Sequence, residues 1–132
     1  MKTTVLITTY NYGRYLPQAV ESALFRNTAN VEVIVVDDGS TDNTKEVLRP
    51  YKGRVRYLYQ ENQGQAQALN NGFDASFGDY IFLLDADDIF YPEKIAEVLG
   101  QGRRFLTINL LNWLFLIPGG LKIRRFNKTK WI

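Results

Sequence analysis

Three acidic residues follow a strongly apolar run in the middle of the sequence. Residues 80–88 read YIFLLDADD, so Asp85, Asp87 and Asp88 come directly after five large, mostly apolar side chains. Two carboxylates about 4 Å apart would repel each other by roughly 4 kcal/mol at an effective dielectric constant near 20. A divalent cation, a shared proton or separation into water would have to relieve that repulsion. The Asp-x-Asp spacing suits a hard cation such as Mg²⁺ or Mn²⁺, which takes oxygen ligands and completes its shell with waters or phosphate oxygens.

A second acidic turn follows an earlier apolar run, VEVIVV at 31–36, which leads into Asp37, Asp38, Gly39 and Ser40. These residue types suit a plain turn followed by a helix cap. They also suit a site in which a carboxylate at a strand end accepts hydrogen bonds from a nucleobase N–H or a ribose hydroxyl. The residues alone leave both interpretations open. The turn at 85–88 is different, because a helix cap needs only one acid and this turn has three.

The composition excludes several kinds of site. The chain has no cysteine and no histidine, which rules out disulfides, thiolate nucleophiles, cysteine- or histidine-ligated zinc and a Ser-His-Asp triad. No GxGxxG turn follows the first apolar run, and no GxxxxGK[ST] motif occurs, so neither a dinucleotide turn nor a P-loop is expected. Any metal must be held by carboxylates, and acid–base chemistry falls to Asp, Glu, Lys or Tyr.

The segments that must position these turns alternate between strand and helix patterns. Strands are predicted at 5–8, 31–36, 55–60 and 80–84, and helices at 15–25, from Thr41 or Asn43 to about 49 with Pro50 ending it, at about 64–77, and from Pro92 onward. This alternation predicts an α/β, Rossmann-like and mainly parallel sheet flanked by helices. Right-handed crossovers would gather the turns TYNYG, DDGS and DADD at one edge, where such sheets bind ligands.

Charge divides the chain near residue 100. Residues 101–132 carry 7 of the 16 basic residues and none of the 14 acidic ones. This tail contains an apolar stretch at 105–117, too short for a spanning helix, with basic clusters on both sides. It indicates either peripheral membrane contact or a cover for an exposed sheet edge. The N-terminus lacks the pattern of a signal peptide, and the cytoplasm is the expected location.

Four stretches resemble, in order and spacing, the N-terminal half of a family 2 glycosyltransferase with the GT-A fold. They are VLITTYNYGRYLPQAVESAL, VEVIVVDDGSTDNT, ENQGQAQALNNGFDASFGDYIFLLDADD and YPEKI, and they cover most of residues 3–99. The resemblance implies an incomplete GT-A sheet, with a nucleotide-sugar-binding half-domain at 1–100 and a separate tail at 101–132. It also implies a UDP- or GDP-linked donor sugar, Mg²⁺ or Mn²⁺, a saccharide or lipid-linked acceptor, inversion at the anomeric carbon, and no nucleic-acid partner.

The resemblance assigns donor-binding roles to residues after the first two strands. Thr8 and Tyr10 would cradle the nucleoside, with the Tyr10 ring against the base. Asp38 would bind the base edge, with Asp37 beside it.

The third turn receives the remaining roles by the same resemblance. Asp85 would lie near the ribose and the donor sugar, and Asp87 would ligate the cation that bridges the two phosphates. Asp88 would order the loop or the next helix.

The chain departs from the family pattern at two places. Leu69 stands where many relatives have an arginine, and residues 101–132 offer no Asp or Glu for the catalytic base that the family places downstream. Three hypotheses follow. The chain is a truncated transferase that keeps donor binding with little or no transfer activity, a non-catalytic nucleotide-binding or interaction module, or an interrupted gene product read out of frame after about residue 100.

Overall fold

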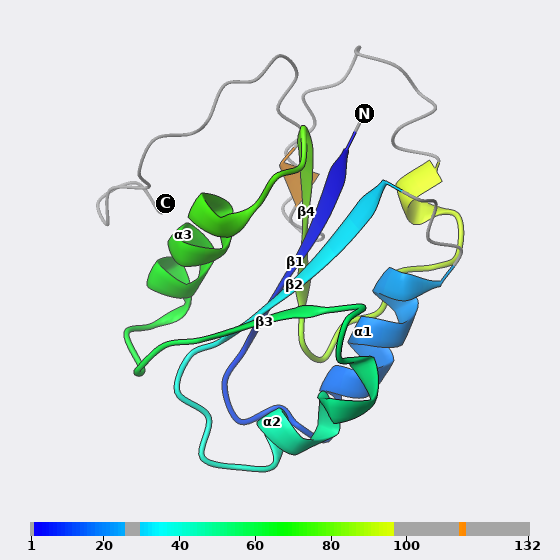
Figure 1. The fold of residues 1–132 in the computed structure, drawn as a ribbon. Helices are drawn as coiled ribbons and strands as arrows, with labels where there is room; N and C mark the ends of the chain where they lie inside the picture. Colours follow the sequence, from blue (N-terminus) through cyan, green and yellow to red (C-terminus); the bar gives the residue numbers. More distant parts are fainter. Residues whose placement is uncertain (1, 26–29, 97–113, 116–132) are drawn as a thin grey trace.

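The protein is built on one twisted sheet with helices on both faces. The computed structural model describes residues 2–25 and 30–96 and the backbone of 114–115. The strands are β1 (Thr3–Thr9), β2 (Val31–Asp37), β3 (Arg56–Tyr59), β4 (Tyr80–Asp85) and β5 (Leu114–Phe115), in the order β3-β2-β1-β4-β5 (Figure 1). β1 to β4 are mutually parallel, and β5 runs antiparallel to β4. The predicted α/β class and parallel sheet are confirmed.

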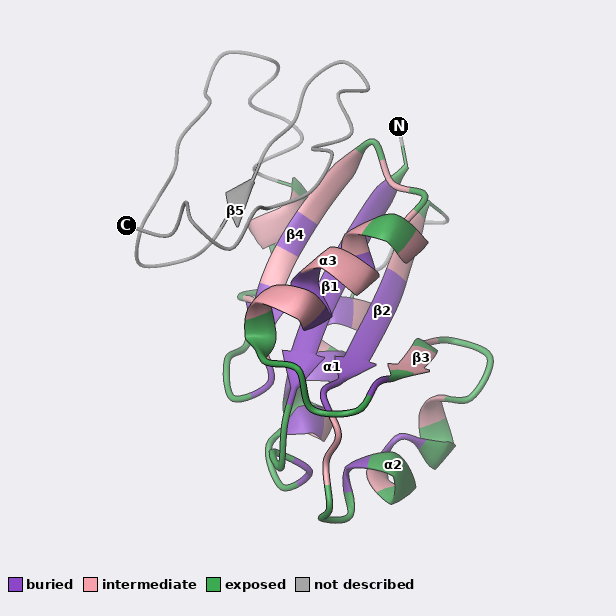
Figure 2. Ribbon diagram, turned by 90° about the vertical axis from the view of Figure 1, so that its left-hand side faces the viewer, coloured by how far each residue is buried: buried purple, intermediate pink, exposed green. Residues whose placement is uncertain are grey.

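The central strands are apolar because both of their faces are covered. Every residue of β1 is buried, and so are the last five residues of β2 (Figure 2). Such continuous apolar runs are typical of the interior of a parallel sheet. β3 is shorter and more exposed, as an edge strand can be.

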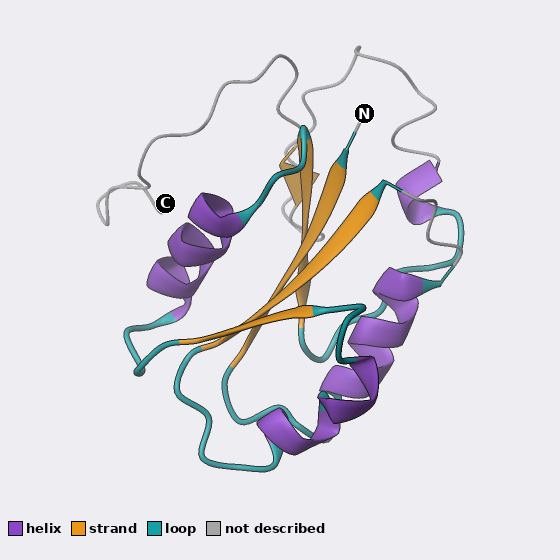
Figure 3. Cartoon of the chain, viewed as in Figure 1, coloured by secondary structure: helices purple, strands orange, loops and turns teal. Residues whose placement is uncertain are grey.

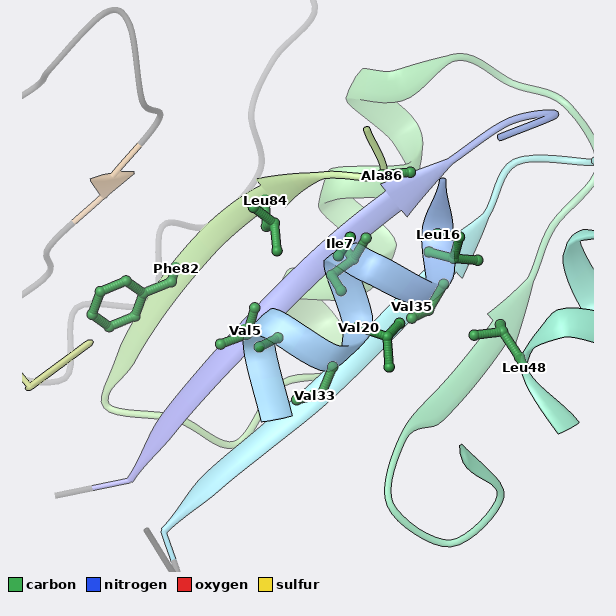
Figure 4. Close-up of a cluster of buried hydrophobic side chains, with 12 residues drawn as sticks. Val5, Ile7, Leu16, Val20, Val33, Val35, Leu48, Phe82, Leu84 and Ala86 are labelled. Atoms are coloured by element: carbon green, nitrogen blue, oxygen red, sulfur yellow. The ribbon is translucent and has the colours of Figure 1, made fainter. Parts of the chain in front are cut away.

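Helices α1 (Leu16–Leu24) and α2 (Thr44–Val47) lie on one side of the sheet, and α3 (Gln65–Ala75) lies on the other (Figure 3). Leu16 and Val20 of α1 pack against Ile7 and Val35 of the sheet (Figure 4). On the opposite face, α3 approaches β1 closely, because a Cβ at Gly72 would collide with the Leu6 side chain. The helical spacing read from residues 15–25 is confirmed.

One helix prediction needs correction. The helix expected up to Arg49 is one turn, Thr44–Val47, followed by a 3₁₀ turn at Arg49–Tyr51. Pro50 lies inside the first turn of this second element, where its missing N–H costs nothing. Neither Thr41 nor Asn43 caps α2 with its side chain; Asp42 Oδ1 accepts from the Thr44 amide at 3.0 Å. The helix expected from Pro92 is seen only at 94–96, and its continuation lies outside the described residues.

The predicted tail at 101–132 lies outside the described residues except for the backbone of β5. Phe115 and Leu114 pair with Ile81 and Phe82 of β4, at the strand end remote from the DADD turn. The membrane contact expected of this tail therefore falls outside the described part of the chain. Among the described helices, none has the length and apolar character to cross a membrane.

Candidate functional site

The three polar turns meet at the carboxyl ends of β1, β2 and β4, at the lower end of the sheet in Figure 1. Thr9 is paired with Asp37 of β2, and Thr8 with Asp85 of β4. The Asp38 amide also donates to the Thr9 carbonyl at 2.9 Å. The acidic turns after β2 and β4 thus flank the turn after β1, as the crossover rule predicts.

The loop after β1 is fastened to the loop after β2 by Asn11, a residue that the sequence analysis did not single out. Its φ is +58°, in the left-handed region that asparagine tolerates best among non-glycine residues. Its Oδ1 accepts hydrogen bonds from the Thr41 amide at 2.8 Å and the Asp42 amide at 3.3 Å. The Gly13 amide donates to Asp42 Oδ2 at 2.9 Å. The segment that carries Tyr10, whose side chain is exposed, is therefore held by several bonds.

Asp37 is buried and both of its oxygens are engaged. Oδ1 accepts from the Ser40 amide at 2.8 Å, and Oδ2 accepts from the Tyr57 hydroxyl at 2.6 Å. Burial, together with the bond to Asp37 and its charge, raises the pKa of Tyr57 well above its usual value. Gly39 completes the turn at φ +83°, and a Cβ there would collide with the Asn62 amide. Both contacts of Asp37 stabilise the turn itself, which is the structural role that the sequence analysis left open beside nucleoside binding.

Asp38 is 5% exposed, and its carboxylate organises the segment that leads into α3. Oδ1 accepts from Gln60 Nε2 at 2.7 Å and from the Gln63 amide at 2.8 Å, and Oδ2 accepts from the Gly64 amide at 2.9 Å. These amides precede the first turn of α3, where a negative charge is favoured by the helix dipole. Three fixed donors thus compensate the burial of the charge.

Asp85 is half-buried at the end of β4 and accepts a bond from Gln65 Nε2 at 3.1 Å. Burial raises the pKa of Asp85, as do the charges of Asp88 and Asp87, while the Gln65 bond opposes the shift. Asp87 and Asp88 are exposed. The repulsion inferred from the sequence is therefore partly relieved by water and partly retained at Asp85.

The donor set at this turn suits a hard cation but does not enclose one. Among the described residues, no group of three or more Asp, Glu, Cys or His side chains is arranged to hold a metal ion. Two or three neighbouring carboxylates without such an enclosure match a cation that takes most of its ligands from water or phosphate.

A cavity of about 400 Å³ opens beside the Asp85 turn. Its wall combines the polar residues Thr8, Gln65, Asp85, Asp88 and Lys94 with apolar residues of β1, α3, β4 and the following loop. Leu69, which replaces the arginine of many relatives, lies on this wall. Among the described residues that line the cavity, Lys94 is the one with a positive charge.

The structure brings the predicted residues to one edge but distributes them unequally. Thr8, Asp85 and Asp88 line the cavity, whereas Tyr10, Asp37, Asp38 and Asp87 are not among its lining residues. Sequence reasoning missed Asn11, which joins two of the loops, and Tyr57, Gln60 and Gln65, which donate to the acids. The density of Gln and Asn in ENQGQAQALNNG, residues 61–72, was the one available signal, and it covers only Gln65.

The chain is similar to many transferases. An uncharacterized glycosyltransferase of Nostoc sp. is 36% identical over 126 residues, covering 92% of this chain and 39% of that protein. The structure of S. aureus TarS 1–349 in complex with UDP-GlcNAc superposes with a TM-score of 0.67 at 25% identity, over 76% of this chain and 30% of that one. A mannosyltransferase from Pyrobaculum calidifontis, in complex with GDP-Man and Mn²⁺, superposes with a TM-score of 0.65 at 24% identity, over 74% and 31% of the chains, which shows a shared fold.

These coverages mean that the chain spans about a third of the length of these relatives. The solved structures are GT-A glycosyltransferases, so the GT-A type of the sheet is confirmed. The sequence profile of Glycosyl transferase family 2 matches residues 4–108, past the predicted boundary at 100, which stays a prediction. With the profile spanning most of its length, the chain belongs to glycosyl transferase family 2.

Proposed function

We propose that this chain binds a nucleoside-diphosphate sugar together with a divalent cation at the edge formed by its three polar turns, and that the bound sugar is the donor for inverting transfer to an acceptor hydroxyl. The observation that carries the proposal is the placement of two acidic turns on either side of β1, with a cavity beside the turn that follows β4. The start of α3 bridges them, since Gly64 binds Asp38 and Gln65 binds Asp85. The UDP-GlcNAc complex of TarS supports the donor class.

The nucleoside end of the donor is assigned to the turns after β1 and β2. The exposed ring of Tyr10 offers a stacking surface for the base. Asp38 offers its remaining acceptor position to a base N–H, and Thr8 lies on the cavity wall between the two acidic turns. Asp37, proposed beside the base, also keeps the turn closed through Ser40 and Tyr57.

The diphosphate end is assigned to the turn after β4. Asp87 is exposed and would hold the cation, Mg²⁺ or Mn²⁺. Asp85, which accepts a hydrogen bond from Gln65, would lie near the ribose and the donor sugar. When bound, such a cation offsets the charge that develops on a departing diphosphate. The complex of the Pyrobaculum mannosyltransferase with GDP-Man and Mn²⁺ is consistent with this role of the fold.

The attacking half of the reaction has no assigned residue. Deprotonation of the acceptor needs a base, and no Asp or Glu follows Glu97 in the chain. We therefore propose donor binding with little or no transfer by this chain alone; the acceptor, a saccharide or a lipid-linked sugar, is assigned to a part of the site beyond residues 1–100.

A non-catalytic nucleotide-binding module is the alternative function. An out-of-frame tail is disfavoured by the Nostoc relative: its alignment covers 92% of 132 residues and leaves about 11 outside. Even if all of these lay at the C-terminus, the alignment would reach about residue 121, well into the tail.

Calorimetry tests the donor proposal directly. UDP and GDP are titrated into the chain with Mn²⁺ and with EDTA. Asp87→Ala should abolish the dependence of affinity on Mn²⁺, while Asp38→Ala should weaken nucleoside binding even in EDTA. Asp74→Ala, an exposed acid on α3, is the matched control. Equal affinity of the wild type in Mn²⁺ and EDTA would remove the metal assignment.

Membrane contact through 101–132 is a separate proposal, supported by the basic clusters around its apolar stretch. Flotation with liposomes that contain anionic lipid, at low salt, tests it. Binding that disappears when residues 101–132 are deleted supports contact, and the absence of binding by the whole chain contradicts it.

A further inference from the structure

Among the described residues, three hydrogen-bond donors reach the carboxylate of Asp38, which leaves one acceptor position. An ionised carboxylate offers about four lone-pair sites, two on each oxygen. Two donors occupy Oδ1, from Gln60 and Gln63, and one donor, the Gly64 amide, occupies Oδ2. The unused position is therefore on Oδ2.

Behind Asp38 lies a chain of three side-chain amides, the amide relay: Gln60, Asn71 and Gln67. Gln60 is 9% exposed and donates from Nε2 to Asp38. Its Oε1 accepts from Asn71 Nδ2 at 2.6 Å, and Asn71 Oδ1 accepts from Gln67 Nε2 at 2.9 Å. The relay runs from α3 to the end of β2.

The relay can be arranged in one direction only. A carboxylate accepts but does not donate, so Gln60 must present its NH₂ to Asp38 and its oxygen to Asn71. Asn71 must then present its own NH₂ to Gln60, because two amide oxygens would otherwise face each other. Gln67 fixes that orientation by donating to the Asn71 oxygen. The orientation of each side-chain amide is thus fixed by its neighbour in the relay.

We infer that Gln60 and Asn71 are positioning residues that set which nucleobases the donor site accepts, an inference that rests on the proposed function. By fixing the position of the Asp38 carboxylate, they leave a single acceptor that requires a donor on the ligand. Uracil and guanine present a ring N–H, whereas cytosine and adenine present an unprotonated ring nitrogen at the corresponding place. A fixed carboxylate disfavours cytosine and adenine, since its oxygen and their ring nitrogen are both hydrogen-bond acceptors.

The test compares UDP with CDP, and GDP with ADP, by calorimetry in Mn²⁺. Asn71→Asp keeps the shape of the side chain and its bond from Gln67 but cannot donate to Gln60. We expect its preference for the ring N–H bases to fall about tenfold, the size of effect that follows loss of a bond in a charged network. Asn71→Ser, which keeps a donor, should retain more of the preference. Asn70→Asp is the control, and it should leave the base preference unchanged. It makes the same change at the preceding residue, whose side chain has no hydrogen bond among the described residues.

A second measurement needs no ligand. The amides of Gln63 and Gly64 donate to Asp38, so their hydrogen exchange in NMR should quicken about fivefold or more in Asn71→Asp, while amides of β1 and β2 keep their protection. Faster exchange with an unchanged base preference would overturn the inference and leave a merely structural relay. Unchanged exchange would overturn it as well. If the wild type binds no nucleotide while exchange still quickens, the proposed function fails and the positioning of Asp38 by the relay stands.

Discussion

At the scale of single residues, neighbouring acids of the same type differ by what surrounds them. Asp37 and Asp38 are adjacent, yet Asp37 bonds Tyr57, which packs against the core on the α1 side, and Asp38 bonds the segment that opens α3. Side chains alternate across a strand, and this sends the two carboxylates to opposite faces. Asp87 and Asp88 lie beyond the end of β4 and stay exposed. Of these four acids, only Asp87 and Asp88 are exposed to water.

Tyr57→Phe tests the structural contribution of Asp37. The change removes the hydroxyl that donates at 2.6 Å and leaves a buried carboxylate oxygen without its partner. We expect the free energy of unfolding to fall by about 2 kcal/mol, the usual range for a bond to a charged group. Urea unfolding measures it. Tyr59→Phe, at an exposed position of the same strand, should be close to neutral; equal effects of the two changes would contradict the assignment.

The loop clamp around Asp42 predicts a dependence of stability on pH. Partial burial raises the pKa of Asp42, but the bonds that it accepts from Thr44 and Gly13 outweigh this and hold the pKa below its ordinary value of 3.8. A lowered folded-state pKa gives stability that is present above the unfolded value and is lost as pH falls through the folded one. Asp42→Asn should therefore be less stable than the wild type at about pH 7, and the difference should be smaller at about pH 3, below the ordinary pKa of the carboxyl. Urea midpoints at both values measure this, and a gap that does not narrow would contradict it.

At the scale of elements, periodicity was enough to predict the parallel sheet, because buried strands must be apolar on both faces and α1 carries a clear helical stripe. The second helix was predicted too long. The sequence predicts that Pro50 ends a helix, whereas it lies in the first turn of a 3₁₀ helix. Residue type alone does not show whether α-helical or 3₁₀ hydrogen bonds form in such a short segment. The amides that orient Asp38 were missed for a different reason. Gln60 and Asn71 are 11 residues apart, and only the packing of α3 on the sheet brings them together.

The contact of α3 with β1 gives a prediction at this scale. Gly72→Ala should raise the intrinsic helix preference by about 1 kcal/mol, yet its methyl group would collide with Leu6. Overpacking typically costs about 1–3 kcal/mol, so we expect net destabilisation in urea unfolding. Leu6→Ala makes room, so the double variant should lose less than the two single changes combined. Asp74→Ala, on the exposed side of α3, is the control for alanine itself. Simple additivity would mean that the helix shifts away from the collision.

At the scale of the whole molecule, the described residues form the part of the sheet to which we assign donor binding. The family match accounts for residues 4–108, and the sheet order gathers the acidic turns at one edge. The chain covers 39% of its Nostoc relative. The edge of β4 that faces away from β1 carries a two-residue antiparallel pairing with β5.

The last prediction concerns catalysis by the 132-residue chain. We expect no sugar transfer at rates that depend on an acceptor, even with a suitable donor and Mn²⁺, because no carboxylate follows Glu97 and the chain contains no histidine. A general base typically contributes about 10²- to 10⁴-fold, and positioning of the acceptor often contributes more. Slow hydrolysis of the donor should persist, since water needs no acceptor surface. The assay follows release of UDP or GDP from a panel of donor sugars, with and without candidate saccharide acceptors. Turnover by the homogeneous monomer that rises with acceptor would contradict the prediction and would locate the base within residues 1–100.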